Sequence, residues 1–407
     1  MITHDPCEYI RGIQDILVSD KKRIAFLFGA GTSLAKKNEK TVTIPAIGKM
    51  TTQILEQLSS NEKFKIAIEE ISEEVGKDKF NIETFLSNIE SKKNIIGNGR
   101  LNGLDLDEFN MLIKQTKDYI RDIVSVHKSV ISENLVKELV HYDFAKWIGK
   151  VDRKYPIEIF TTNYDYFFEL GLEENNIPYY DGFSGSFRPF FNSESVEDLN
   201  FTPEETKLWK IHGSLGWHFE DKTSKVFRKD SDEEDIIIYP SSLKYINSRK
   251  QPYTALMDRL TNYLKQPDTI LFVLGYSFGD DHINERIITA LKTNPLTHVY
   301  VFYYDAIWKD DTTKSYELNE NSKLTQIAQD NSRISVLGGR SAVIGSQLGK
   351  WKLKSKPEKD DLFIKSFYNI DKMEYDDEGL NMFNGEGELT ICDFSKFVCF
   401  LQSMICD

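Results

Sequence analysis

Five consecutive residues after an apolar stretch could bind the phosphates of a nucleotide. Residues Ile24–Phe28 are apolar and aromatic, as in a buried parallel strand, and Gly29, Ala30, Gly31, Thr32 and Ser33 follow directly. Closely spaced glycines at the end of a strand let the backbone approach a phosphate, and the two hydroxyl groups can add donors. We therefore predict that this turn contacts a dinucleotide.

The turn differs from the usual dinucleotide fingerprint in two ways. Leu34 stands where the third glycine would be, and Lys49–Gln53 contains no acidic residue to bind a ribose hydroxyl. A conventional NAD dehydrogenase is therefore disfavoured.

A second stretch, Ile157–Thr161, leads into the polar residues Thr162, Asn163 and Asp165. In open α/β sheets, ligands bind beyond the carboxyl ends of the strands. Because side chains alternate along an extended chain, Asn163 and Asp165 are expected on the same side. One of them can cap the following helix, expected at Tyr166–Leu172, while the other faces a ligand.

A histidine follows a third stretch. Residues Leu208–Ile211 are followed by His212 and Gly213. Imidazole is the side chain that titrates nearest neutral pH, so His212 is a candidate general base. A structural role remains an alternative for a histidine at the end of a strand.

Two later strand ends add further candidates. Gly275 and Ser277 follow the apolar stretch Thr269–Leu274, and the adjacent Asp280 and Asp281 are expected to cap the helix His282–Leu291. Asp305 follows His298–Tyr304 and could accept from a ribose hydroxyl. A turn or cap role is an equal alternative for Asp305.

These stretches must be positioned by an α/β scaffold. Strands are expected at Lys22–Phe28, Ile157–Thr161, Leu208–Ile211, Asp235–Tyr239, Thr269–Leu274, His298–Tyr304 and Arg333–Leu337. Most are apolar on both faces, which predicts a doubly wound, mostly parallel, Rossmann-like sheet covered by helices.

The expected order of domains is a first part of the core at 1–48, an insertion at 49–150, the rest of the core at 151–349 and a C-terminal extension at 350–407. The insertion shows helical periodicity at Met50–Leu58, Phe64–Val75, Ile82–Ile89, Leu106–Val126 and Glu133–Ile148, with Asn81 as a cap. In the extension a short strand is expected at Leu389–Cys392 and a helix at Phe394–Ile405, with its cysteines buried.

Composition limits the classes of function. The 407 residues carry a net charge of -13, which argues against a general nucleic-acid binder. The four cysteines form no C-x-x-C pair, so a four-cysteine zinc site is disfavoured. No signal peptide and no apolar run of membrane-spanning length is apparent, so a cytoplasmic protein is expected.

The order of these motifs resembles that of the sirtuins, the NAD-consuming silent information regulator family. Gly29–Ser33 resembles the family's Gly-Ala-Gly-x-Ser, and Thr161–Asp165 its Thr-Gln-Asn-x-Asp. His212-Gly213 resembles the catalytic His-Gly, and Gly275–Ser277 the Gly-Thr-Ser. The resemblance covers Lys22 to about Gly339, interrupted by the helical insertion.

The differences from sirtuin deacylases disfavour an acyl-lysine groove. The zinc module is absent, Thr162 replaces a glutamine, and Ala46-Ile47-Gly48 replaces the Asp-Phe-Arg of the family's flap. The form of Gly275–Asn284 is similar to the bacterial sirtuin-like branch of antiphage defence, whose members hydrolyse NAD. The length and the helical insertion resemble the branch member that pairs with a HerA-type hexameric ATPase.

The resemblance implies an NAD+ hydrolase that uses NAD as its substrate and needs no zinc. Asn163 would position the attacking water, and His212 would be the general base, acting on a ribose hydroxyl or on that water. Gly29–Ser33 would hold the pyrophosphate, Gly275 and Ser277 the adenosine half, and Asp165 the nicotinamide carboxamide. Thr162, Gly213 and Asp305 complete the expected binding set. Homo-oligomers and a HerA-type ATPase are the expected partners, with no membrane and no direct contact with nucleic acid.

Other functions of the same cleft stay open. A zinc-free deacylase or ADP-ribosyltransferase would use a different acceptor, and a regulatory module would sense NAD or ADP-ribose without consuming it. A nuclease is disfavoured, because no compact acidic cluster is seen at the strand ends.

Overall fold

A ten-stranded sheet forms the centre of the fold. This computed structural model describes residues 2–77, 79–220, 223, 225–229, 251–304, 307–308, 314–358, 361–371, 373–375 and 381–405. In spatial order the sheet contains β1 (Thr3–His4), β16 (Gln347–Trp351), β15 (Ser341–Ile344), β14 (Ile334–Leu337), β11 (His298–Phe302), β10 (Thr269–Leu274), β2 (Arg23–Phe28), β3 (Glu158–Thr161), β7 (Thr206–Lys210) and β4 (Tyr179–Tyr180). All pairs from β14 to β4 are parallel, and β15 is antiparallel to both of its neighbours. The predicted α/β class with a mostly parallel sheet is confirmed.

The strand order reverses between β2 and β10. After β2 the chain adds β3 and then β7 on one side, and it later adds β10, β11 and β14 on the other side. The last residues of the two central strands, Phe28 and Leu274, lie opposite each other in the parallel register. Such a reversal opens a crevice at the carboxyl ends of the strands, which is where open α/β sheets bind ligands.

Helices cover both faces of the sheet. On β2, Ile24, Phe26 and Phe28 face one apolar core, whereas Ala25 and Leu27 face the other. The first core is covered by α1 (Pro6–Val18), α7 (Val140–Lys150), α8 (Phe167–Glu174), α14 (Leu362–Phe367) and α15 (Phe394–Gln402). The second is covered by α9 (Ser193–Glu197), α11 (Tyr253–Leu264), α12 (Asp281–Thr293) and α13 (Lys323–Asp330). Burial on both faces explains why these strands are apolar throughout.

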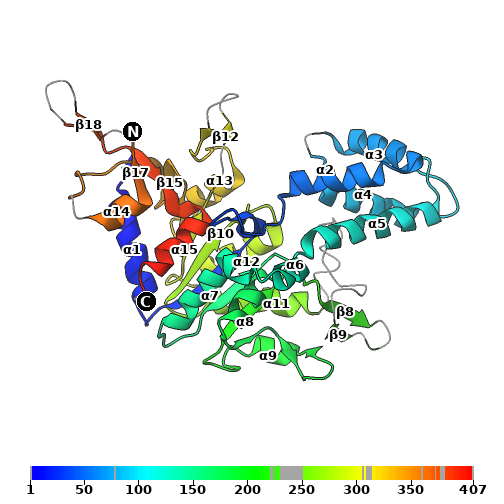
Figure 1. Ribbon diagram of the computed structural model, residues 1–407, viewed down its shortest axis with the longest axis horizontal. Coiled ribbons are helices and arrows are strands. Elements are labelled where there is room, and N and C mark those ends of the chain that lie inside the picture. The colour runs from blue at the N-terminus through cyan, green and yellow to red at the C-terminus, as the bar shows by residue number, and fades with distance from the viewer. Residues whose placement is uncertain are drawn as a thin grey trace.

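A helical lobe is inserted between β2 and β3. It contains α2 (Ile47–Leu58), α3 (Glu62–Val75), α4 (Ile82–Ile95), α5 (Leu106–Val124) and α6 (His127–Ser132) around a third apolar core. Figure 1 shows α2 to α5 grouped at the end of the molecule opposite the two chain termini. Asn81 and Thr84 form a capping box at the start of α4, which confirms Asn81 as the predicted helix cap.

The last expected helix of the lobe is divided. The periodicity of Glu133–Ile148 predicted one helix, but the structure has a 3₁₀ turn at Val136–Glu138 and then α7. Leu139 is extended between them and breaks the helix. The buried side chains of α7 belong to the core beneath the sheet and not to the core of the lobe. The domain boundary near residue 150 stays a prediction.

The C-terminal segment packs against the same core. The expected strand at Leu389–Cys392 was wrong in extent, because β20 (Gly387–Leu389) pairs with β17 (Tyr368–Ile370) and Thr390–Cys392 is a 3₁₀ turn. Cys392 is buried, but Cys399 lies on the exposed side of α15, so its expected burial was wrong. The expected strand Asp235–Tyr239, Cys406 and Asp305 lie outside the described residues.

Smaller sheets complete the described fold. A four-stranded sheet contains β5 (Phe183–Ser184), β6 (Phe190–Phe191), β9 (Lys225–Arg228) and β8 (Trp217–Glu220). Hairpins pair β12 (Ile307–Trp308) with β13 (Lys314–Ser315) and β18 (Met373–Tyr375) with β19 (Asn381–Phe383). In the described part of the chain, no helix combines the length and the apolar character needed to cross a bilayer.

Candidate functional site

A cavity of about 450 Å³ lies where the carboxyl ends of β2, β3, β7 and β10 meet. Its volume falls within the roughly 300–1,000 Å³ of typical ligand sites. Sequence-predicted residues from all four strand ends line it: Ala30, Gly31, Ser33, Thr162, Asn163, Asp165, His212, Gly275 and Ser277. The structure therefore brings the four motifs together at the reversal of strand order.

The turn after β2 interlocks with the loop after β10. The N–H of Gly31 donates to the carbonyl of Gly275 at 2.9 Å. A Cβ on Gly29 would lie 2.4 Å from that carbonyl oxygen, and one on Gly31 would lie 2.7 Å from the Cα of Gly275. Gly275 itself has φ +65° and packs against the Thr32 nitrogen. The glycines are thus required by the close approach of two backbones.

The side chain of Asn163 is held by its amide nitrogen. Nδ2 donates to the Gly29 carbonyl at 3.1 Å and also lies 3.2 Å from Thr32 Oγ1 and 2.9 Å from Ser33 Oγ. The carbonyl acceptor fixes the orientation of the amide. Asn163 is 6% exposed and lines the cavity. Its Oδ1 is therefore the atom of the carboxamide that suits a donor from a ligand or a water molecule.

Asp165 joins the same network. Its Oδ2 accepts from Ser33 Oγ at 2.8 Å, and its Oδ1 accepts from the N–H of Phe167, the first residue of α8, at 3.0 Å. One carboxylate therefore serves both the helix start and the cavity wall. Asn163 and Asp165 both contact Ser33, as expected from their alternation along the chain.

His212 is paired with an acidic residue that the sequence analysis assigned only to a cap. Its Nε2 lies 3.1 Å from Asp280 Oδ2, while Asp280 Oδ1 accepts from the N–H of His282 in α12. The carboxylate favours the tautomer that carries hydrogen on Nε2, and in that tautomer Nδ1 carries the lone pair of a general base. Both residues line the cavity. In the sequence, the acidic pair Asp280-Asp281 at the start of α12 was the signal that could have indicated a carboxylate partner for His212.

The loop that carries Asp280 is held by several hydrogen bonds. Phe278 has φ +58°, a rare conformation for a bulky residue, and its carbonyl accepts from Asn284 Nδ2 at 2.8 Å. The Tyr276 hydroxyl lies 3.1 Å from both the Asp280 carbonyl oxygen and Asn284 Oδ1. These contacts fix the carboxylate that orients His212.

The helical lobe supplies an apolar wall that the sequence analysis did not assign to the site. Its contribution comes from the segment before α2 and from α2, α4 and α5, at Ile44, Pro45, Ala46, Ile47, Met50, Ile82, Ile120 and Val124. Neither lysine nor arginine is among the described residues that line the cavity, and Glu83, Asp165 and Asp280 are its acidic groups. An anionic ligand group would therefore depend on backbone and hydroxyl donors at this site.

The remaining predicted residues do not line the cavity or lie outside the described chain. Within the turn, Thr32 Oγ1 donates to the Gly29 carbonyl at 2.8 Å, and Thr32 is fully buried. Gly213 has φ +98° and turns the chain after His212. Asp305 is outside the described residues. Within the described ranges, His, Cys, Asp and Glu side chains form no group of three that could hold a metal ion.

Comparison with known families matches part of the chain. The SIR2-like domain family matches residues 157–326, which include Asn163, His212, Gly275 and Asp280. This match supports a sirtuin-like relationship for that part of the chain, together with an NAD-related activity. The turn Gly29–Ser33 lies outside the matched residues. No curated protein matches the chain.

Proposed function

We propose that this chain is an NAD+ glycohydrolase that releases nicotinamide and ADP-ribose. The observation that supports this proposal most strongly is a single cavity at the reversal of strand order. The carboxamide of Asn163, the imidazole of His212 and the glycine turn all line this cavity. The match of residues 157–326 to the SIR2-like domain supports the choice of NAD as the substrate.

Each wall of the cavity has a part in binding. The pyrophosphate lies at the turn Gly29–Ser33, close to Ser33, and the adenosine half contacts Gly275 and Ser277. Asp165 accepts from the nicotinamide carboxamide with the lone pairs that its two protein contacts leave. The apolar wall from the lobe excludes water from the rest of the ribose.

In the reaction the bond from C1′ to the nicotinamide nitrogen breaks, and its electron pair neutralises the pyridinium. An oxocarbenium-like ribose results, which fixed dipoles in a dry site stabilise. Asn163 Oδ1 accepts a hydrogen bond from the attacking water, and His212 takes the water's proton as the C1′–O bond forms. Proton transfer of this kind contributes about 10²–10⁴-fold. Asp280 holds the imidazole and stabilises its protonated form.

The test is product analysis with purified protein and NAD, without any acceptor. We expect free ADP-ribose and nicotinamide, and a fall of about 10²–10⁴-fold in His212→Ala and in Asn163→Ala. Wild-type turnover in His212→Ala or Asn163→Ala would remove that residue from the mechanism. Formation of O-acyl-ADP-ribose from an acyl-lysine peptide would favour the deacylase.

The biological role that we propose is NAD depletion during bacterial antiphage defence, gated by assembly with a HerA-type ATPase. The resemblance of Gly275–Asn284 to the defence branch supports it. The helical lobe offers exposed apolar residues for an assembly, among them Ile66, Ile95 and Met111. Light scattering and NAD consumption, measured with and without the purified ATPase, test this part. Monomers only, with turnover unchanged by the ATPase, would contradict it.

A further inference from the structure

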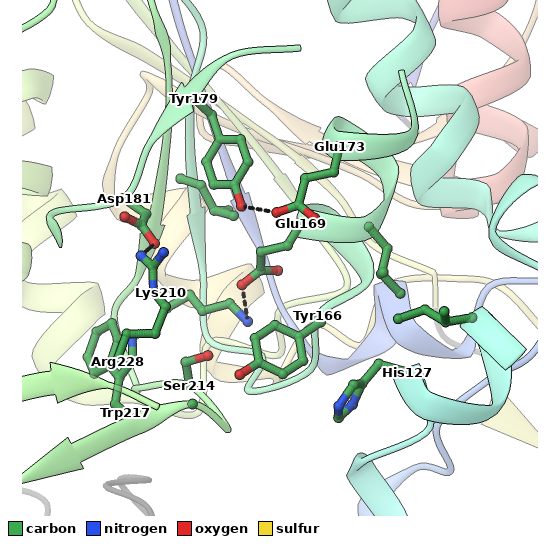
Figure 2. Close-up of a pocket in the computed structure, with 14 residues that line it drawn as sticks. His127, Tyr166, Glu169, Glu173, Tyr179, Asp181, Lys210, Ser214, Trp217 and Arg228 are labelled. Atoms are coloured by element: carbon green, nitrogen blue, oxygen red, sulfur yellow. Dashed lines mark hydrogen bonds and ion pairs between the residues drawn. The ribbon is translucent and has the colours of Figure 1, made fainter. Parts of the chain in front are cut away.

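A second cavity, of about 200 Å³, lies beside the first and shares none of its lining residues. Figure 2 shows charged and aromatic side chains from α6, α8, β4, β7, β8 and β9 converging on it. Lys210 connects the two cavities, because its ammonium contacts the backbone carbonyls of Tyr164 and Asp165, which line the first one.

Most of the charges in this second cavity have partners. Arg228 pairs with Asp181, the Tyr179 hydroxyl donates to Glu173 at 2.9 Å, and Lys210 Nζ lies 2.8 Å from Glu169 Oε1. These contacts connect neighbouring elements of the fold around the cavity (Figure 2).

One oxygen is left over. Glu169 Oε2 is buried and has no hydrogen-bond partner among the described residues. The side chain of Glu169 as a whole is only 13% exposed. Burial raises the pKa of Glu169 to about 7, against the opposing effect of Lys210. A buried carboxylate oxygen without a donor is costly, so this position favours a ligand that supplies one.

The balance of charge and the aromatic rings indicate what kind of donor fits. Three carboxylates, Glu169, Glu173 and Asp181, face two permanent cations, Lys210 and Arg228, so one positive charge would balance the lining. The rings of Tyr166, Tyr179 and Trp217 also line the cavity, and aromatic faces attract cations.

We propose that the second cavity binds a small organic monocation, a primary ammonium on an apolar body, through Glu169 Oε2. The ammonium donates to this oxygen while Oε1 keeps its bond to Lys210, and the apolar body lies against Tyr166 and Trp217. Because Lys210 also holds the carbonyls of Tyr164 and Asp165, occupancy of the second cavity is linked to the wall that carries Asn163.

Calorimetric titration of the full chain with benzylamine tests the site, with benzyl alcohol and benzoate as the neutral and anionic counterparts. We expect saturable one-to-one binding of benzylamine at pH 8, and at least tenfold weaker binding of the other two, about 1.4 kcal/mol. Glu169→Gln should weaken benzylamine binding at least tenfold. Glu174→Gln is the matched control, because that carboxylate lies on the same helix, pairs with Lys137 and does not line the cavity; it should change affinity less than threefold.

A second measurement uses the unaltered protein and does not depend on the folding of a variant. The ammonium needs the ionised carboxylate, so benzylamine affinity should rise as the pH increases through about 7. The charged groups and the tyrosine that act on Glu169 are Lys210 on β7, Asp165, Tyr179 on β4 and Arg228 on β9. The other titratable side chains that line the same cavity are His127 on α6, Tyr166, Glu173 and Asp181.

Three results would overturn the proposal: no benzylamine binding at millimolar concentration, as for an oxygen satisfied by water alone; equal binding of benzyl alcohol; or unchanged affinity in a folded Glu169→Gln variant. Binding is measured without NAD, so these outcomes are independent of NAD hydrolysis.

Discussion

Asp280 contacts His212 and α12 with separate oxygens: Oδ2 lies 3.1 Å from the imidazole Nε2, and Oδ1 accepts from the N–H of His282. The carboxylate is thereby fixed by a helix start at the same time as it orients a candidate base. The two residues are 68 positions apart in the chain and follow different strands. The arrangement makes Asp280 a positioning residue for the proposed proton transfer.

Asp280→Asn should separate these two roles. Asparagine is a good N-cap, so α12 should form normally. Its amide nitrogen, however, turned toward Nε2, would favour the tautomer with the lone pair on Nε2. We expect NAD turnover to fall by about 10²-fold or more with NAD affinity largely kept. The pH profile of kcat should shift as well, which a purely structural role would not cause.

Asp281→Asn is the matched control, because this neighbouring carboxylate is exposed and pairs with Lys323 on the surface. It should leave turnover within about twofold of the unaltered protein. Equal losses in Asp280→Asn and Asp281→Asn would show that the effect comes from the helix start and not from His212.

Gly275→Ala should destabilise the cleft. The residue has φ +65°, and a Cβ would lie 2.6 Å from the Thr32 backbone nitrogen. Both backbones must move, so we expect a loss of about 1–3 kcal/mol in unfolding free energy and a larger loss of NAD binding. Chemical denaturation and calorimetry measure the two effects.

Gly279→Ala offers a control four residues away in the same cavity. Its Cβ would meet only Ser277 Oγ, at 3.3 Å, which is a side chain that can move. This variant should stay within about 0.5 kcal/mol of the unaltered protein. If Gly275→Ala were equally mild, the interlock of the two turns would not be rigid.

The positions of the strand ends could be predicted from the chain because their signals are local. Each end has an apolar run followed by small or polar residues, as at Phe28 to Gly29 and Leu274 to Gly275. Parallel strands then bring such ends to one edge of the sheet. The meeting of Asn163 with the Gly29 turn follows from this geometry.

The pairing of side chains could not be predicted in the same way. Asp280 has an ordinary cap sequence, and nothing local indicates that its second oxygen faces His212. The apolar wall from Ile82 and Ile120 depends on how the lobe folds back over the sheet edge. The break at Leu139 was missed because apolar periodicity continues on both sides of it. Long-range packing decides the pairing of Asp280 with His212, the position of the apolar wall and the break at Leu139.

At a buried ion pair beside the sheet, loss of one partner should destabilise the fold strongly, whereas loss of both charges should be tolerated better. Arg259 is 1% exposed and pairs with Glu158 on β3, whose Oε2 also accepts from Trp209 Nε1 at 2.8 Å. Arg259→Met would leave the carboxylate buried and uncompensated, and we expect a cost of about 3–5 kcal/mol.

Adding Glu158→Gln to Arg259→Met removes that charge and keeps an acceptor for Trp209. The double variant should therefore be more stable than Arg259→Met alone in urea unfolding. Additive losses would contradict this, and would mean that the bonds from Arg259 to the Val196 and Asp198 carbonyls carry the stability.

Acid should destabilise the fold through His141. This imidazole is 2% exposed among Phe167, Phe168 and Phe394, and burial lowers its pKa to about 4 from an ordinary 6.5. The folded state therefore keeps it neutral, while the unfolded state takes up a proton below pH 6.5. Its contribution is present above pH 6.5 and is lost as the pH falls toward 4.

His141→Phe removes this titration and fits an aromatic environment. Between pH 7 and pH 5 the unaltered protein should lose about 2 kcal/mol more unfolding free energy than the variant, as the pKa difference requires. Glu169 acts in the opposite direction in the same window, because its raised pKa favours the folded state as the pH falls toward 4.5. Glu169 is present in both proteins, so its contribution to the unfolding free energy cancels in the comparison. Parallel stability curves for the two proteins would show that the imidazole is protonated at its site in the folded state.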